Sequence, residues 1–458
     1  MRVSKRLLTL GVAIFFAACD SDDTAPSSPP PPPAATSTVQ VLHASPDAPP
    51  VNVLLDGTEV LSEVDYKASS GWAEIDVGTY SVQVDGILPS GNAAVIGPVD
   101  LTFEADMTYT IAAVDSIATL EPVVIEQPRT NVSSGSARLF VLHAANNVQQ
   151  LVGAAVDVYV TAPGADLAAS APTGSFEFKE TLGPVEITAG DYQIRVGVGD
   201  PANANFVLAF DSGTLTLLDG TDLVLAAVPT TTPESSPISL LALDSSGASE
   251  ILDTGTAARI RVGHLSADTP AVDVYADGSA LLQGVTFPAV SGMLEVPPDT
   301  YTVEVATAGD YPAGVAIGPA DIEFAAATTT DVLAVNELAA IEPLVLVDDP
   351  RSIGTYAKVR IVHASTLAQD VDVYIATPGT LIDTVDPALT DVPFKANTGY
   401  IALDAGDYEI TVTRAGTKTA AFGPLPVTAA NGDVLTLIAR DPVPGSAELG
   451  VLLLDDTG

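Results

Sequence analysis

An internal repeat, marked by the four histidines of this 458-residue chain, constrains the fold more than any other sequence feature. Each histidine ends a short run in which apolar and polar residues alternate, as they do in a β-strand that faces a core on one side. Because similar residues follow each histidine, every run opens one copy of a repeated unit. The four runs are VQVLH ending at His43, RLFVLH at His143, RIRVGH at His264 and VRIVH at His363.

The four units match one another in alternation. The first and third align without a gap from their histidines to Glu121 and Glu342, so that His43 corresponds to His264 and Tyr80 to Tyr301. The second and fourth align with each other instead, His143 with His363 and, after a small difference in loop length, Tyr192 with Tyr408. The simplest account is an ABAB array, in which a unit of two domains has been duplicated in tandem.

Each unit has the pattern of an all-β domain. Alternating runs such as Val272-Asp273-Val274 are followed by turn dipeptides, among them Asp277-Gly278, which tolerates the positive φ angles of a tight hairpin. Units of roughly 95 to 120 residues with a turn every 8–12 residues are typical of a two-sheet sandwich. We therefore predict four tandem immunoglobulin-like β-sandwiches, arranged like beads on a string.

A tyrosine opens a strand after a turn in the second half of every unit, as in Asp76-Val77-Gly78-Thr79-Tyr80. This arrangement resembles the tyrosine corner of Greek-key sandwiches, in which the phenol hydrogen-bonds to nearby backbone. The predicted corner residues are Tyr80, Tyr192, Tyr301 and Tyr408.

The N-terminal stretch resembles a bacterial lipoprotein signal peptide. Basic residues precede an apolar run over residues 7–17, and small residues lead to Cys19, the only cysteine of the chain. Cleavage before Cys19 would leave it to carry acyl chains, which anchor a protein without a transmembrane helix. The alternative is an ordinary signal peptide with an incidental cysteine. The acidic and proline-rich stretch that follows predicts a semi-rigid spacer between the membrane and the first domain.

These features predict six segments in a protein of the bacterial cell envelope, lipid-anchored and extracytoplasmic, either periplasmic or on the cell surface. They are a lipoprotein signal peptide at 1–18, an acidic, Pro-rich linker at 19–37, and sandwiches at 38–130 (type A), 136–252 (type B), 257–351 (type A) and 357–458 (type B).

The charge of the chain excludes one class of partner. With 58 acidic and 17 basic residues the net charge is −41 at pH 7. Such a surface repels nucleic acid over a Debye length of roughly 8–10 Å at physiological salt. We therefore predict no nucleic-acid partner. We also predict no cofactor, because no motif for one stands out, and leave open loose binding of Ca²⁺ by separate loops.

The openings of units one and three, over residues 39–53 and 262–275, resemble the signature of the bacterial domain of unknown function 4397 family. Unit four has Leu367 where the signature has aspartate, and unit two has Asn146-Asn147 with five extra residues before Asp157. The resemblance implies an immunoglobulin-like sandwich in an exported envelope protein. It implies no activity, because none is assigned to the family.

Strand alternation points each histidine toward the core of its own domain. His43 shares a face with Val39 and Val41, whereas Gln40 lies on the other face. In the other units that second face carries charged residues, which are Arg138, Arg259, Arg261, Lys358 and Arg360. We favour a half-buried ring that pins the following loop by a hydrogen bond.

The alternative is a metal or acid–base site, formed by His43 with Asp47 or by His264 with Asp268, in a metal-dependent envelope hydrolase. One histidine per domain is few for zinc, which binds three or four close protein ligands. The chain also has no Gly-x-Ser-x-Gly elbow. We therefore predict neither catalytic residues nor a metal site.

Two aromatic residues are candidates for ligand binding. Alternation places Trp72 on an outer face with Glu74 and Asp76, and Tyr400 takes the corresponding position near Asp404. Many non-catalytic modules use such an aromatic to stack on a sugar ring or to hold a protein partner. The alternative is an aromatic that covers a sheet edge or lies against the next domain.

Together these features predict a non-catalytic binding or adhesion module, or a spacer, of the cell envelope. Its expected partners are the membrane, through the N-terminal lipid, and a glycan or an envelope protein.

Overall fold

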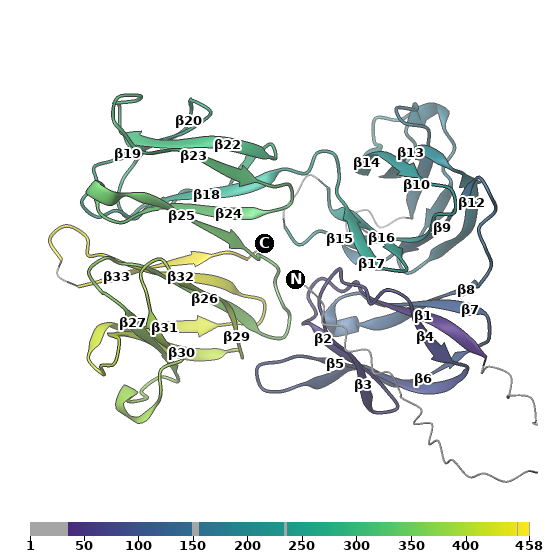
Figure 1. The fold of residues 1–458 in the computed structure, drawn as a ribbon, viewed down its shortest axis with the longest axis horizontal. Helices are drawn as coiled ribbons and strands as arrows, with labels where there is room; N and C mark the ends of the chain where they lie inside the picture. Colours follow the sequence, from purple (N-terminus) through teal and green to yellow (C-terminus); the bar gives the residue numbers. More distant parts are fainter. Residues whose placement is uncertain (1–34, 149–154, 233–235, 447, 458) are drawn as a thin grey trace, which may run out of the picture.

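The computed structural model describes residues 35–148, 155–232, 236–446 and 448–457. They form four β-sandwiches in tandem, as predicted, and each sandwich consists of two sheets (Figure 1). We call the sheet that contains the histidine-ended strand the histidine sheet and the other one the second sheet. In all four histidine sheets the histidine-ended strand pairs in parallel with a strand from late in the same sandwich.

Sandwich 1 has a histidine sheet of order β4-β1-β7-β8 and a second sheet of order β3-β2-β5-β6. Its elements are β1 (Thr36–His43), β2 (Val51–Leu55), β3 (Thr58–Val64), β4 (Ala73–Asp76), β5 (Gly78–Gly86), β6 (Ala93–Phe103), β7 (Met107–Val114), the 3-10 helix η1 (Ile117–Thr119) and β8 (Glu121–Pro128).

Sandwich 2 has a histidine sheet of order β12-β9-β15-β16-β17 and a second sheet of order β11-β10-β13-β14. Its elements are β9 (Ser136–His143), β10 (Val156–Thr161), η2 (Leu167–Ala169), β11 (Gly174–Phe176), β12 (Thr181–Thr188), β13 (Gly190–Val198), β14 (Val207–Leu217), β15 (Asp222–Pro229), β16 (Ile238–Asp244) and β17 (Gly247–Ile251).

Sandwich 3 repeats the order of sandwich 1, with sheets β21-β18-β24-β25 and β20-β19-β22-β23. Its elements are β18 (Ala258–His264), β19 (Val272–Ala276), β20 (Ser279–Val285), β21 (Leu294–Val296), β22 (Asp299–Thr307), β23 (Val315–Phe324), β24 (Thr329–Val335), η3 (Leu338–Ala340) and β25 (Glu342–Asp348).

Sandwich 4 has sheets β29-β26-β32-β33 and β28-β27-β30-β31. Its elements are β26 (Ala357–Ala364), β27 (Val371–Ala376), η4 (Ile382–Thr384), β28 (Leu389–Val392), β29 (Asn397–Leu403), β30 (Gly406–Arg414), β31 (Ala420–Ala429), β32 (Val434–Arg440) and β33 (Gly450–Asp455).

The four tyrosines selected from the sequence all have the geometry of a tyrosine corner. Each phenol donates a hydrogen bond to the backbone oxygen four residues earlier in the chain, which fixes the turn before the strand. The bonds run from Tyr80 to Asp76 (3.1 Å), from Tyr192 to Thr188 (2.7 Å), from Tyr301 to Pro297 (2.9 Å) and from Tyr408 to Asp404 (2.8 Å).

The sandwiches are not separate beads, and the structure corrects this prediction. The histidine sheets of sandwiches 1 and 2 pack face to face (Figure 1). Their contact is a continuous apolar cluster, to which sandwich 1 contributes Leu42 and Val114 and sandwich 2 contributes Phe140 and Leu142. Leu42 and Leu142 have no exposed surface. The apolar side chains on the outer faces of these strands bury one another, which stabilises the pair by roughly 25 cal/mol per Å² removed from water.

Sandwiches 3 and 4 form a second pair in the same way. Leu265 and Leu333 of sandwich 3 pack against Val362 and Ile438 of sandwich 4. Strand alternation alone would place Arg360 in solvent, but the paired sandwich covers it and leaves it 2% exposed. Gln40 of the first pair is covered in the same way and is 0% exposed. The repeated unit is therefore a back-to-back pair of sandwiches.

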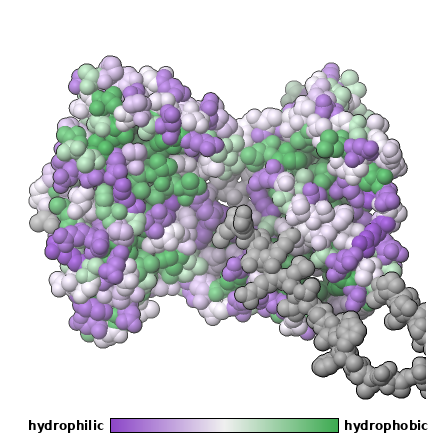
Figure 2. Space-filling view, viewed as in Figure 1, coloured by the Kyte–Doolittle hydropathy of each residue, from purple (hydrophilic) through white to green (hydrophobic). Residues whose placement is uncertain are grey.

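The two pairs also contact each other. The segment between β25 and β26 lies against sandwich 1, where the backbone N–H of Gly354 donates to the Asp47 oxygen at 2.8 Å. Arg351 donates to the Ala48 oxygen at 3.2 Å. Figure 2 shows the pairs as two lobes, whose visible surface mixes hydrophilic and hydrophobic residues.

Candidate functional site

Each signature histidine holds the loop that follows it. The His43 ring is buried at the end of β1, where its Nδ1 accepts a hydrogen bond from the Ser45 N–H at 3.4 Å. Nε2 therefore carries the proton and donates to the Pro49 oxygen at 3.0 Å. His264 and His363 make equivalent bonds, to Ser266 and Pro270 and to Ser365 and Gln369. These rings bind backbone groups with both nitrogens, which leaves neither nitrogen free for a metal.

His143 differs from the other three. Its Nδ1 accepts from the Ala145 N–H at 3.4 Å, but its buried Nε2 has no hydrogen-bond partner among the described residues. In this unit the loop carries Ala145-Asn146-Asn147 where the first unit has Ser45-Pro46-Asp47.

An aromatic ring packs edge-on against every histidine, at centroid distances of 6.1 to 6.4 Å. The rings are Tyr66, Phe178, Phe287 and Phe394. In three units a lysine follows the aromatic residue and forms a salt bridge with the paired sandwich. The pairs are Lys67 with Glu250, Lys179 with Glu121 and Lys395 with Glu342. The segment beside the histidine thus contributes to the contact between sandwiches.

Asp47 joins the loop after β1 to the segment after β7, the neighbouring parallel strand of the same sheet. Its carboxylate accepts from the Ile117 N–H at 2.8 Å, at the start of η1. Asp268 accepts from the Leu338 N–H at 2.8 Å, at the start of η3. Among the described residues no hydrogen bond connects either carboxylate to its histidine, so the acid–base pairs considered from the sequence are not assembled.

Trp72 lies at the seam between sandwiches 1 and 2. It precedes β4, its side chain is 42% exposed, and its backbone N–H donates to the Ser245 oxygen of sandwich 2 at 3.1 Å. The nearby carboxylate of Glu74 is paired with Arg129 at 2.9 Å. The side chain is therefore partly exposed on a backbone that both sandwiches hold in place.

Tyr400 has a different environment. It is half-buried at the contact of sandwiches 3 and 4, and its hydroxyl donates to Asp456 at 3.1 Å. The Arg360 guanidinium lies 4.8 Å from the ring centroid and the Lys358 ammonium 5.0 Å from it. Burial raises the pKa of the Tyr400 phenol, so it remains a donor. Tyr400 is thus engaged by contacts within the chain, whereas Trp72 is 42% exposed.

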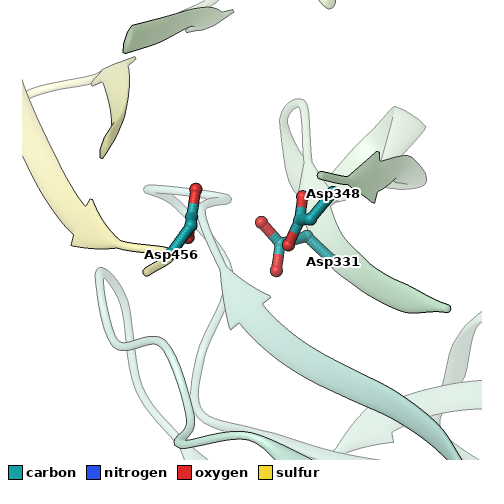
Figure 3. A group of neighbouring side chains, drawn as sticks. All are labelled: Asp331, Asp348 and Asp456. Atoms are coloured by element: carbon teal, nitrogen blue, oxygen red, sulfur yellow. The ribbon is translucent and has the colours of Figure 1, made fainter. Parts of the chain in front are cut away.

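A buried charged cluster beside Tyr400 was not foreseen from the sequence. Asp331 of β24, Asp348 at the end of β25 and Asp456 after β33 converge at the contact of sandwiches 3 and 4 (Figure 3). Arg261 binds Asp331 with two bonds of 2.7 and 2.8 Å and reaches Asp456 at 2.5 Å. Arg360 reaches Asp348 at 2.5 Å. The sequence feature that could have indicated this cluster is an arginine on the outer face of each histidine-ended strand of this pair, Arg261 in β18 and Arg360 in β26.

Comparison with known proteins identifies the family. Residues 37–154, 258–374 and 357–458 match the sequence model of a family described as a domain of unknown function, DUF4397. The chain belongs to the DUF4397 family. Between the first and second matches, residues 155–257 are left out, which include most of sandwich 2.

Other comparisons add little to this assignment. Among solved structures, the Bacillus anthracis TIE protein is 12% identical, with a TM-score of 0.16, over 89% of this chain and 68% of that one. A search of curated proteins found no match.

Sandwich 4 departs from the DUF4397 signature and compensates for the change. Leu367 stands at the aspartate position, but Asp441, which follows β32, approaches the same loop from the other side. Its carboxylate accepts from the Ser365 hydroxyl, from the Thr366 hydroxyl at 2.8 Å and from the Leu367 N–H at 3.2 Å. A carboxylate thus bridges the same two strand ends from the opposite strand, which indicates that the signature aspartate has a structural role.

Burial of the histidines predicts a pH dependence of stability. Desolvation lowers the pKa of His43 from 6.5 to about 4, so the folded ring stays neutral where the unfolded one binds a proton. The contribution of His43 is complete above about pH 6.5 and is lost as the pH falls toward 4, at up to about 1.4 kcal/mol per pH unit. Urea unfolding of the full chain at several pH values should show this slope for the first pair, and His43→Gln should reduce it. An unchanged slope in the variant would assign the effect to other groups.

Cys19 and the signal sequence lie outside the described residues, so their assignment stays a prediction. Within the described ranges, no helix is long and apolar enough to cross a bilayer.

Proposed function

We propose that this DUF4397 chain is a lipid-anchored, non-catalytic binding module of the bacterial cell envelope, built from two rigid pairs of sandwiches. The proposal rests on the observation that the signature histidines and aspartates have structural roles. The ring nitrogens of His43, His264 and His363 and the carboxylates of Asp47 and Asp268 bind backbone groups that fix loops. No observation among the described residues favours the metal-dependent hydrolase.

Attachment to the envelope would come from acyl chains on Cys19, with the acidic, Pro-rich stretch between Cys19 and β1 as a spacer. The anchor can be tested separately from binding. Cys19→Ser should abolish incorporation of labelled palmitate and move the protein from the membrane fraction to the soluble fraction of lysed cells. Retention of the variant in the membrane fraction would contradict lipid anchoring at this residue.

The binding surface would centre on Trp72, which offers an open indole face for a sugar ring or for a side chain of an envelope protein. We expect Trp72→Ala to reduce binding of the chain to isolated cell-envelope material by about tenfold or more, with a nearly unchanged melting temperature. Pull-down at graded protein concentrations measures this.

Val77→Ala is a matched control for Trp72→Ala. Val77 is an apolar side chain of similar exposure, 40%, on the same sandwich. It should bind like the parent chain. Equal binding by the Trp72 variant and the parent would favour a spacer without a ligand at this site.

A further inference from the structure

The charged cluster at the contact of sandwiches 3 and 4 carries an uncompensated negative charge. Three carboxylates, those of Asp331, Asp348 and Asp456, face only two guanidinium groups, those of Arg261 and Arg360. The three aspartate side chains are at most 1% exposed. An unpaired charge buried in this way is costly unless it is neutralised.

One oxygen of the cluster is unused. Asp348 Oδ2 is buried and has no hydrogen-bond partner among the described residues. Nη2 of Arg261 lies 3.6 Å from it, beyond hydrogen-bond reach. Carboxylate oxygens of Asp331 and Asp456 lie within 4.8 Å of one of its oxygens. A proton on Oδ2 would turn this unpartnered acceptor into a donor, in a cluster that contains two further carboxylates.

We propose that the cluster is a proton-binding site: one proton, held on Asp348 and shared toward the neighbouring carboxylates, strengthens the contact between sandwiches 3 and 4. A divalent cation does not fit the same place, because two guanidinium groups already occupy the cluster and would repel it.

The surroundings of Asp348 favour uptake of a proton. Burial, together with the charges of Asp331 and Asp456, raises its pKa from 3.8 to about 7, although the Arg360 guanidinium opposes the shift. The charged and titratable groups that face it come from every strand packed around it. They are Asp331 on β24, Arg261 on β18, Arg360 on β26, Tyr400 on β29 and Asp456 after β33.

The first pair of sandwiches is an internal control without these charges. When His43 is aligned with His264, Gln40, Thr110 and Gln127 take the places of Arg261, Asp331 and Asp348. The strand register is the same, since Gln40 pairs with Thr110 as Arg261 pairs with Asp331. All three uncharged residues are buried. Proton binding should therefore distinguish the second pair from the first.

The sign of the effect follows from the two states of Asp348. In the closed contact the carboxyl holds its proton up to about pH 7, whereas in an opened contact it releases the proton above its ordinary pKa of 3.8. Opening therefore releases a proton between about pH 4 and 7, and the contact weakens as the pH rises through this range, by up to tenfold per pH unit.

Hydrogen exchange of the full chain, read by mass spectrometry and corrected for intrinsic rates, tests the proposal. From about pH 8 to about pH 5.5, protection of β24, β25, β32 and β33 should rise on the order of tenfold. Protection of β7 and β15 in the first pair should not rise. Asp348→Asn, which mimics the protonated carboxyl, should give high protection at both pH values.

An infrared measurement gives a second readout that does not depend on stability. A carboxylic-acid band should be present at about pH 5.5 and absent from the Asp348→Asn variant. The proposal is overturned by an equal pH response in both pairs, by a retained response in the variant, by absence of the band, or by a stoichiometric divalent metal in the purified chain.

Discussion

Replacing Arg360 with alanine is expected to lower the free energy of unfolding of the second pair by about 3–5 kcal/mol. Arg360 is 2% exposed and hydrogen-bonds to Asp348, to Thr436 and to the Val347 oxygen. Its removal would leave three buried carboxylates with one guanidinium, since Arg261 alone would remain. The cost of uncompensated buried charge is much larger than the cost of breaking an exposed pair.

Denaturant unfolding of the full chain, with hydrogen exchange to locate the destabilised strands, measures this effect. Sandwiches 3 and 4 should lose stability, and sandwiches 1 and 2 should not. Arg129→Ala is the control, because Arg129 and its partner Glu74 have side chains 41% and 67% exposed and should contribute less than about 1 kcal/mol. A loss below about 1 kcal/mol for Arg360→Ala would contradict the described burial of the cluster.

Leu142→Ala is expected to cost about 2–5 kcal/mol and to destabilise two sandwiches from one position. Leu142 belongs to sandwich 2, yet its buried side chain lies in the apolar cluster shared with Leu42 and Val114 of sandwich 1. The cavity left by the substitution would lie between the two histidine sheets. Both sheets would lose packing, because neither can close the gap alone.

Hydrogen exchange should therefore show faster opening of β7 as well as β15 in the Leu142→Ala variant, while the second pair stays unchanged. Leu218→Ala offers a matched control in the same sandwich, because Leu218 is 68% exposed and should change stability by less than about 0.5 kcal/mol. Destabilisation confined to sandwich 2 would show that the sandwiches unfold independently.

The repeat and the all-β fold could be predicted because they depend on local patterns. The alternation that ends at His43 sets the face of the ring, and the turn before Tyr80 sets the corner, each within a few residues. The ABAB duplication could be inferred from the nearly constant spacing between corresponding residues of the units. Such features are encoded by neighbours in the sequence, and the structure contains them where they were expected.

The pairing of sandwiches depends on contacts that local alternation does not reveal. In the first histidine strand, the polar residue Gln40 indicated that the outer face is exposed to solvent. Leu42 lies on the same face and is apolar. Phe140 and Leu142 repeat this signal in unit two. Apolar residues on both faces of a strand indicate a sheet that is covered on both sides, and this is the observation that could have predicted the pairs.

The charged cluster could not be predicted from the sequence for a second reason, which is the separation of its residues along the chain. Arg261 meets Asp331 after 70 residues and Asp456 after 195 residues, so no sequence window contains the set. Tyr400 was placed on the outer face of its own sandwich, but the contact between sandwiches 3 and 4 surrounds it. Trp72, at the comparable strand position of sandwich 1, is 42% exposed, and its ligand remains a prediction.

Small-angle X-ray scattering of the chain from residue 35 onward tests the central claim, that the sandwiches form two contacting back-to-back pairs. A compact body of this length has a radius of gyration of about 22 Å, and the paired arrangement should give no more than about 28 Å. Four separate beads in a line would give about 40 Å. A value near the smaller figure supports the pairs, and a value near the larger one would contradict them.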